Sequence, residues 1–384
     1  MKKIGILSLY YNNYNMGGLL QAYALQKALQ KTGCIAEQVT FNYFRFYCNE
    51  PEVIAPVKRT FFQKVKNRIN FYKDRYKANK KIKIFAKRLN SFAKFMNDIP
   101  HSKAIYTSVE QFCDLYDVFI VGSDQVWGDW LPEKALKSFL MEHSGFNGKR
   151  YSYAASIGTD DINPQLNELY SNTLEKFNGI SVREHSAQTE INKLLAKKDI
   201  RIDLDPTLLL NADEWNKVAV NSRQKKKYIF CYYLGKEKKY RTETTLVAKR
   251  LGLPIVTLPY IKDNRIEDFD NDFGNIRDFK SGPADFIGLI KNAELVITDS
   301  YHAMIFSCLF QKNFYILKRE NKEVRSTNSR IHDFLIEFNL ENRFITTEKL
   351  YDISLDNNVD FNTFNSLIDK LRESSYNYLR KIAN

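Results

Sequence analysis

The residues with the clearest chemical potential stand near the C-terminal end of the chain. An apolar run, Leu295 to Ile297, gives way to the polar residues Thr298, Asp299 and Ser300, and His302 follows just before a second apolar stretch. This pattern predicts a buried strand, a tight polar turn and a helix that starts near His302. A helix N-terminus attracts anions, and histidine exchanges protons near neutral pH. We therefore predict that His302 is a proton-transfer group that meets an anionic substrate. The alternative is a capping or core histidine.

Further polar residues follow short apolar runs in the N-terminal half. They are Ser123, Asp124, Gln125, Ser156 and Arg183. Gly17 and Gly18 stand in a loop just before a predicted helix at 19–29, where glycine lets the backbone approach a ligand. Each of these features also fits a plain turn. Together they predict the rim of a binding site, because ligands of α/β sheets lie beyond the carboxyl ends of the strands.

The scaffold that would bring these strand ends together can be predicted from the order of the elements. A strand at 4–9, a loop, a helix and a strand at 36–41 are typical of a doubly wound parallel sheet, and a second half repeats this alternation. We predict an α/β protein with two facing Rossmann-like domains, 1–220 and 221–360, the second carrying His302. A final helix at 361–384 is expected to pack back on the first domain.

Composition limits the class of protein. The 384 residues are 44% hydrophobic and 14% aromatic, which suits folded domains. The five cysteines are scattered without metal-ligand spacing, so a reducing compartment is favoured over a disulfide scaffold. No apolar stretch approaches the roughly 20 residues of a membrane span. We expect a cytoplasmic protein without a cofactor. Because no carboxylate cluster resembles a magnesium cage, we also expect no essential metal.

The positive charge is concentrated in one segment. Residues 58–94 hold 14 Lys and Arg against one acidic residue, Asp74, which accounts for the net charge of +13. Apolar residues recur there at helical spacing, so 45–105 is predicted to be a basic helical insertion in the N-terminal half. It is either a solvated face or a surface that contacts an anionic membrane or a phosphate-bearing acceptor. Nucleic acid is not expected, because no motif for reading it is present.

Six motifs together resemble the polysaccharide pyruvyl transferase family. In chain order they are Asn15-Met-Gly-Gly-Leu-Leu-Gln-Ala-Tyr-Ala-Leu25, Val121-Gly-Ser-Asp-Gln-Val-Trp127, Tyr153-Ala-Ala-Ser-Ile-Gly158, Ile180-Ser-Val-Arg-Glu184, Asp205-Pro-Thr-Leu208 and Val296-Ile-Thr-Asp-Ser-Tyr-His302. The resemblance implies a GT-B-like fold, the twin-domain fold of nucleotide-sugar glycosyltransferases, with the N-terminal domain on the acceptor side. It implies transfer of a pyruvyl group from phosphoenolpyruvate to two hydroxyls of a cell-surface saccharide, free or lipid-linked, as a ketal.

This reaction assigns roles to the candidate residues. His302 is the acid or base, and Asp299 either orients it or caps the following helix. Arg183 is an anion clamp or, alternatively, an ion-pair partner of Glu184 or another carboxylate. Asp124 and Gln125 are expected to meet sugar hydroxyls, with turn formation as the alternative.

The sequence departs from the family pattern beside the histidine. Some members look as if they carry arginine where this chain has Ser300, which removes one anchor for an anionic donor, and Arg330 is our candidate to replace it. Two other functions remain open. One is a glycosyltransferase that uses a nucleotide sugar, and the other is a non-catalytic scaffold on the inner face of the cell membrane, held there by 58–94.

Overall fold

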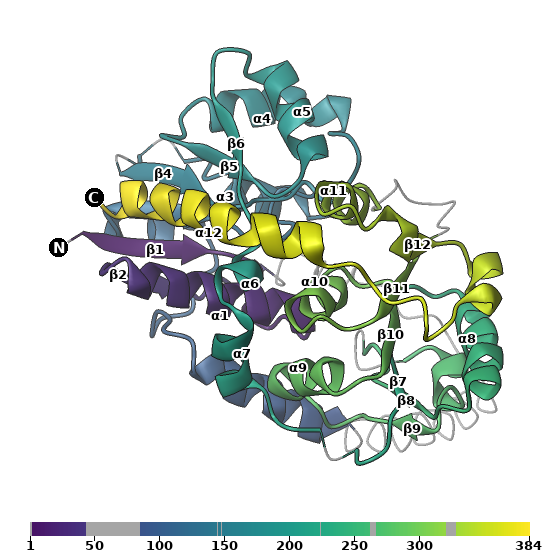
Figure 1. The fold of residues 1–384 in the computed structure, drawn as a ribbon. Coiled ribbons are helices and arrows are strands. Elements are labelled where there is room, and N and C mark those ends of the chain that lie inside the picture. Colours follow the sequence, from purple (N-terminus) through teal and green to yellow (C-terminus); the bar gives the residue numbers. More distant parts are fainter. Residues whose placement is uncertain are drawn as a thin grey trace, which may run out of the picture.

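The structure, a computed structural model, describes residues 2–43, 85–143, 145–146, 148–222, 224–261, 266–319 and 328–384. Its N-terminal half is built on parallel strands (Figure 1). They are β1 (Lys3–Leu7), β2 (Ile35–Gln38), β3 (Val118–Val121), β4 (Lys149–Ser152), β5 (Ile180–Val182) and β6 (Ile200–Ile202). The first four are ordered β2-β1-β3-β4, and isolated bridges attach the β5-β6 pair beside β4. Its helices are α1 (Met16–Lys31), α3 (Glu133–Phe139), α4 (Asn167–Leu174) and α5 (His185–Leu194).

The C-terminal half is a six-stranded parallel sheet with the order β12-β11-β10-β7-β8-β9. The strands are β7 (Ile229–Tyr232), β8 (Ile255–Thr257), β9 (Ile276–Arg277), β10 (Leu295–Thr298), β11 (Phe314–Leu317) and β12 (Phe344–Ile345). The helices are α8 (Lys238–Leu251), α9 (Pro283–Lys291), α10 (Tyr301–Leu309) and α11 (Ser329–Glu337). The order reverses between β7 and β10, which makes that point the topological switch of a doubly wound sheet.

Two short helices and one long one connect the halves. α6 (Pro206–Leu209) and α7 (Ala212–Val218) follow β6, and α12 (Asn362–Ala383) ends the chain. α12 runs back along the N-terminal half (Figure 1), where the Tyr378 hydroxyl donates to the carbonyl oxygen of Ser152 at 3.1 Å. The backbone N–H of Leu204 donates to the hydroxyl of Ser375 at 3.2 Å. The end of the chain is thereby fixed to β4 and to the residues after β6.

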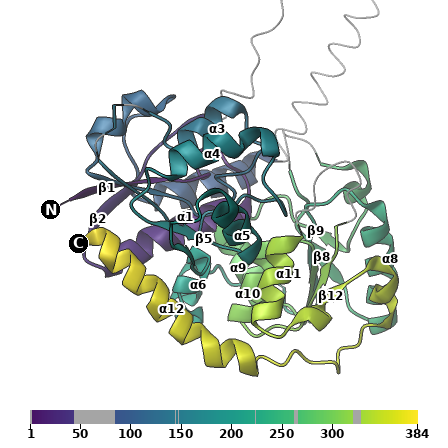
Figure 2. The same cartoon turned by 90° about the horizontal axis from the view of Figure 1, so that it is seen from above.

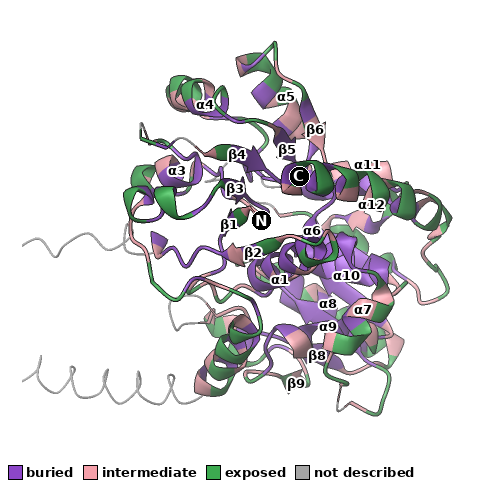
Figure 3. Ribbon diagram, turned by 90° about the vertical axis from the view of Figure 1, so that its left-hand side faces the viewer, coloured by how far each residue is buried: buried purple, intermediate pink, exposed green. Residues whose placement is uncertain are grey.

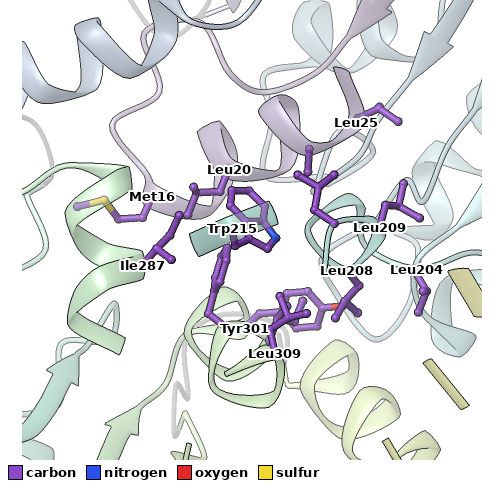
Figure 4. Close-up of a cluster of buried hydrophobic side chains, with 14 of the residues drawn as sticks. Met16, Leu20, Leu25, Leu204, Leu208, Leu209, Trp215, Ile287, Tyr301 and Leu309 are labelled. Atoms are coloured by element: carbon purple, nitrogen blue, oxygen red, sulfur yellow. The ribbon is translucent and has the colours of Figure 1, made fainter. Parts of the chain in front are cut away.

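One hydrophobic core is shared by the two halves. Leu20 of α1, Trp215 of α7 and Phe306 of α10 belong to a single buried cluster (Figure 4 labels Leu20 and Trp215). The Trp215 ring lies 5.0 Å from that of Phe306, centroid to centroid. α10 is buried along its whole length (Figure 3). Because α1 and α10 pack into one core, the residues at their N-termini are held in fixed relative positions.

The expected basic insertion can be followed only in part, because 44–84 lies outside the described residues. Residues 85–97 are helical. Within them Arg88 is buried, and its guanidinium donates to the carbonyl oxygens of Pro259 (2.5 Å) and Asp278 in the C-terminal half. Phe95 of the same helix packs against Tyr23 of α1. This helix therefore joins the two halves at one end of the boundary between them.

Candidate functional site

His302 occupies the first turn of α10, directly after β10. The Ser300 hydroxyl caps the helix by accepting the backbone N–H of Ala303 at 3.4 Å. The helix begins here because the strand is followed by a good N-cap residue and then by apolar residues. His302 is 8% exposed, so its imidazole is almost enclosed by protein. The predicted strand, turn and helix are therefore present, and they place the ring at the boundary between the two halves.

Gly17 of α1 forms the floor under this imidazole. A Cβ atom added to Gly17 would lie 1.9 Å from Nδ1 of His302 and 2.4 Å from both Cγ and Cε1. No side chain fits at this position unless the ring moves. The need for glycine here comes from the approach of α1 to α10, and a ligand is not required to explain it.

The carboxylate beside His302 belongs to Asp205, which follows β6. Its Oδ2 atom lies 3.6 Å from Nε2 of His302 and accepts a hydrogen bond from Nη1 of Arg183 at 2.9 Å. Its Oδ1 atom accepts the backbone N–H and the hydroxyl of Thr207, at 3.0 and 2.6 Å. Burial opposes ionisation of Asp205, but His302, Arg183 and Thr207 together hold its pKa below the usual range.

Arg183 is the centre of a buried ionic cluster, which we call the Arg183 cluster: Arg183, Asp124, Glu184 and Asp205. Besides Asp205, its guanidinium faces Glu184 at 3.4 Å and Asp124 at 3.5 Å, and it stacks 4.5 Å from the ring centre of Tyr301. Burial disfavours the charged form, yet Tyr301 and the three carboxylates outweigh it and raise the pKa of Arg183. The structure shows the ion pairs considered for Arg183, and its role as an anion clamp stays a prediction, since Arg183 also lines the cavity described below.

Arg330, at the start of α11, is in the opposite situation. It is 7% exposed, and its Nε and Nη1 atoms are buried without a hydrogen-bond partner. Burial, together with the positive charges of Arg319 and Arg183, lowers the pKa of Arg330 to about 10. The nearby carboxylates of Asp124 and Glu184 only partly offset this, and a buried guanidinium with two unbonded nitrogens is costly to a folded protein unless a ligand compensates it. Arg330 is therefore the residue here best suited to receive an anion.

Unpartnered polar atoms gather around this point. Ten buried side-chain nitrogen and oxygen atoms of the described residues have no hydrogen-bond partner, and four belong to Arg330, His302 and Glu184. Burial also raises the pKa of Glu184, although Arg183 partly offsets this. Most buried polar groups in proteins are satisfied, so such a concentration marks a site that a ligand completes.

A cavity of about 160 Å³ opens beside the cluster. It lies between the ends of β5 and β6, the helices α10 and α11, and α12, and its lining includes Arg330, Glu184 and Tyr301. α5 and α11 contact each other (Figure 2), and both contribute residues to the lining of the cavity. The cavity therefore gives a small polar ligand access to Arg330.

Asp299 does not have either role predicted for it. Its two carboxylate oxygens accept the backbone N–H groups of Leu234 and Gly235, each at 2.7 Å, and the guanidinium of Arg319 donates to Oδ2 at 3.2 Å. The carboxylate reaches across the switch point to the loop after β7. Asp205 thus takes the place next to His302 that we expected for Asp299, and Ser300 is the residue that caps α10.

The remaining predicted residues lie in turns, except Gly18, which with Gly17 lies in the first turn of α1 rather than in the loop predicted before it. The Ser123 hydroxyl donates to the carbonyl of Ala154 at 2.7 Å, and the Ser156 hydroxyl accepts the N–H of Gly158 at 3.0 Å, so both are used internally. Gly18 lies against Asn13. Gln125 packs on Gly158. Both serines are buried, and substrate binding by Ser123 and Ser156 stays a prediction.

Sequence reasoning missed two members of the site, Asp205 and Glu184. Asp205 belongs to the motif Asp205-Pro-Thr-Leu208, and Glu184 is predicted only as an ion-pair partner of Arg183. The available signal was positional, since each comes just after a short strand of the same sheet. Carboxyl ends of neighbouring parallel strands meet at one edge, so this position could have added both residues to the candidate site.

Two further findings bear on the class of protein. Among the residues that the structure describes, no group of three or more His, Cys, Asp or Glu side chains could hold a metal ion. The described helices include none long and apolar enough to cross a bilayer.

Two parallel α/β sheets with a site at their boundary define the GT-B-like class. The UDP-GlcNAc 2-epimerase of Methanocaldococcus jannaschii, in complex with UDP-GlcNAc and UDP, matches with a TM-score of 0.52 at 13% identity and covers 99% of both chains. S. aureus MnaA with UDP matches with a TM-score of 0.50 at 12% identity, covering 99% of this chain and 91% of the other. At such identities the likeness shows the fold alone.

Within that class the sequence is more specific. The family model of polysaccharide pyruvyl transferases matches residues 15–321, so the chain belongs to this family. No curated protein sequence matches it. Membership indicates an enzyme, a transferase of polysaccharide biosynthesis.

Proposed function

We propose that the protein transfers the pyruvyl group of phosphoenolpyruvate to two hydroxyls of a saccharide that is part of a cell-surface polysaccharide or its lipid-linked precursor. The observation that carries the proposal is the buried guanidinium of Arg330, whose Nε and Nη1 atoms have no partner. Phosphoenolpyruvate carries a phosphate and a carboxylate, and either group suits a guanidinium. Family membership supplies the reaction class.

The reaction needs a proton delivered to C3, attack of each hydroxyl at C2, and loss of phosphate. Two hydroxyl protons leave, and one ends on C3 and the other on the released phosphate, so atoms and charges balance. His302 is the proton-transfer group, because its ring lies at the boundary of the two halves with Nε2 facing the carboxylate of Asp205. Arg330 binds an anionic group of the donor. Arg319, whose charge lowers the pKa of Arg330, adds to the positive field there.

The nucleotide-sugar alternative finds less support in the geometry. In a doubly wound sheet the switch point is the expected place for a nucleotide phosphate. Here the N–H groups of Leu234 and Gly235 at that point are already bonded to the carboxylate of Asp299. A carboxylate in this position repels a phosphate. The scaffold alternative depended on 58–94, of which only 85–94 is described, so it stays a prediction.

The test begins with binding and continues with turnover. Phosphoenolpyruvate should raise the melting temperature of the protein, and a panel of nucleotide sugars should not. Lipid-linked saccharides should then stimulate phosphate release from phosphoenolpyruvate, with a pyruvyl ketal detected on the saccharide by mass spectrometry. Stabilisation by a nucleotide sugar, without any effect of phosphoenolpyruvate, would reject the proposal in favour of a glycosyltransferase.

A further inference from the structure

The two ring nitrogens of His302 have different surroundings. Nε2 is buried, has no hydrogen-bond partner, and faces Oδ2 of Asp205 at 3.6 Å. Nδ1 is the ring atom closest to Gly17. The two nitrogens are therefore not equivalent, and only one of them is expected to exchange a proton with a substrate.

The contact with Gly17 fixes the plane of the ring. A carbon added at Gly17 would be equally distant, 2.4 Å, from Cγ and Cε1 and nearest to Nδ1 at 1.9 Å. Such a point lies above the face of the imidazole, because a carbon approaching Nδ1 within the ring plane would be farther from its two bonded neighbours. Gly17 thus covers the face of the ring and leaves the in-plane lone pair of Nδ1 uncovered.

Asp205 is held firmly behind the other nitrogen. Thr207 donates two hydrogen bonds to Oδ1, and Arg183 donates one to Oδ2. Since three donors fix this carboxylate, it cannot turn away from His302. A fixed carboxylate beside one ring nitrogen favours the tautomer with its proton on that nitrogen.

We propose that Asp205 is a positioning residue that keeps the proton of neutral His302 on Nε2, so that Nδ1 is the atom that exchanges protons with the substrates. Nδ1 takes the proton of an attacking saccharide hydroxyl. The positive charge that then forms on the imidazole is stabilised by Asp205, and Nδ1 releases the proton to C3 or to the leaving phosphate. This proposal rests on the proposed function for the identity of the substrates. The tautomer itself can be tested without any substrate.

The hydrogen bonds of Asp205 also predict which tautomer His302 adopts in the variant Asp205→Asn. The two Thr207 donors, against the single donor from Arg183, favour the amide oxygen at the position of Oδ1, which places the amide nitrogen at the position of Oδ2, toward His302. An N–H donor facing Nε2 forces Nε2 to accept and moves the ring proton to Nδ1. The variant should therefore carry the opposite tautomer. Its kcat should fall by about 10²- to 10⁴-fold, as expected for a histidine held in the wrong tautomer, with the donor KM changed by less than about twofold.

The experiment is a long-range ¹H–¹⁵N correlation spectrum of protein labelled with ¹⁵N-histidine. The chain has five histidines, and the signals missing from His302→Ala identify His302. The proposal expects the Nε2–H form in the wild type and the Nδ1–H form in Asp205→Asn. Asp270→Asn is the matched control, a buried carboxylate bonded to Arg241 in the C-terminal half, and it should leave the His302 signals as in wild type.

Each outcome has a separate meaning. An Nδ1–H form in the wild type overturns the proposal, and so does an Asp205→Asn variant with unchanged tautomer and kcat. The wild-type spectrum alone decides the tautomer if Asp205→Asn does not fold. A wild-type protein with the Nε2–H form and no turnover of phosphoenolpyruvate refutes the proposed function instead.

Discussion

Two buried arginine–carboxylate groups stand in the two halves of the molecule, and they differ in how completely their atoms are bonded. In the C-terminal half, Nε and Nη2 of Arg241 donate to the two oxygens of Asp270 at 2.9 and 3.2 Å. Its Nη1 atom donates to the carbonyls of Gly235 and Glu237. Every nitrogen of that guanidinium is used, so the pair has the character of a structural brace.

In the Arg183 cluster, by contrast, hydrogen bonds and ion pairs do not satisfy every polar atom. Three carboxylates surround one guanidinium there, an oxygen of Glu184 has no partner, and Nε2 of His302 nearby has none either. Arg330 completes the contrast, because two of its nitrogens are free. Both regions are buried and charged, so burial and charge alone do not separate a functional site from a structural one. The concentration of unsatisfied atoms does, because four of the ten such atoms in the described residues belong to Arg330, His302 and Glu184, where they keep capacity for a ligand.

His302→Ala is the change expected to have the largest effect. It should lower phosphate release from phosphoenolpyruvate by about 10²- to 10⁴-fold, because proton transfer is lost. The melting temperature should stay near that of the wild type, since the buried Nε2 atom makes no hydrogen bond. Near-normal turnover would remove His302 from the mechanism and weaken the contrast between the two regions.

Replacing either arginine by methionine compares the two regions directly. Arg241→Met leaves Asp270 buried without its partner and should cost about 3–5 kcal/mol of unfolding free energy. Arg330→Met removes a buried charge that has no partner on two nitrogens, so stability should not fall. Urea unfolding measures both. A large loss of stability in Arg330→Met would mean that its guanidinium is structural.

Gly17→Ala should perturb the site through the ring that it touches. The added carbon would overlap the imidazole of His302 at 1.9 Å and displace it, so kcat should fall by one to two orders of magnitude, about 1.4–2.8 kcal/mol. Gly18→Ala meets the amide of Asn13 at 2.6 Å, the end of a side chain that can move, and its effect should be smaller. If Gly18→Ala proves the more harmful of the two, the contact with His302 does not position the ring.

The pH dependence of stability should have opposite signs in the two regions, and this is the smallest of the effects. The pKa of Asp205 is lowered in the folded protein, so its stabilisation is present above the unfolded pKa of about 3.9 and is lost as pH falls below it. Burial raises the pKa of Asp270, although Arg241 partly offsets this, so its contribution weakens as pH rises above about 3.9.

The stability difference between wild type and Asp205→Asn should therefore widen from pH 3 to pH 6, by about 1 kcal/mol. The difference for Asp270→Asn should narrow over the same range. Urea unfolding at several pH values measures both slopes. If both stability differences changed with pH in the same direction, the opposite pKa shifts of Asp205 and Asp270 would be contradicted.

The fold could be predicted further than the site. Apolar runs that end in polar turns predict the strand before His302 and the helix after it. A parallel strand that is buried on both faces needs a continuous run of apolar residues, which can be recognised in the sequence. Contacts between segments that are distant in the sequence produce no comparable local pattern. Asp299 looked like the partner of His302 because it is three residues away, but its carboxylate reaches the loop after β7.

The partner that was found, Asp205, lies almost 100 residues earlier and comes close only through the packing of the two halves. The same holds for Arg183. Whether its guanidinium is free for a ligand depends on three carboxylates, and only Glu184 is adjacent in sequence. Arg330 was predicted as a replacement anchor, but the property that singles it out, burial without partners, appears only in the folded structure.

The central claim is that the incompletely bonded cluster at the boundary of the two halves, with Arg330 at its edge, binds an anionic donor. Calorimetric titration of phosphoenolpyruvate into wild-type protein and Arg330→Met tests it most directly, with Arg241→Met as the control for loss of a buried arginine outside the site. We predict that wild type and Arg241→Met bind phosphoenolpyruvate and that Arg330→Met binds at least about 10-fold more weakly, the equivalent of 1.4 kcal/mol. Equal affinity of Arg330→Met and wild type would contradict the claim.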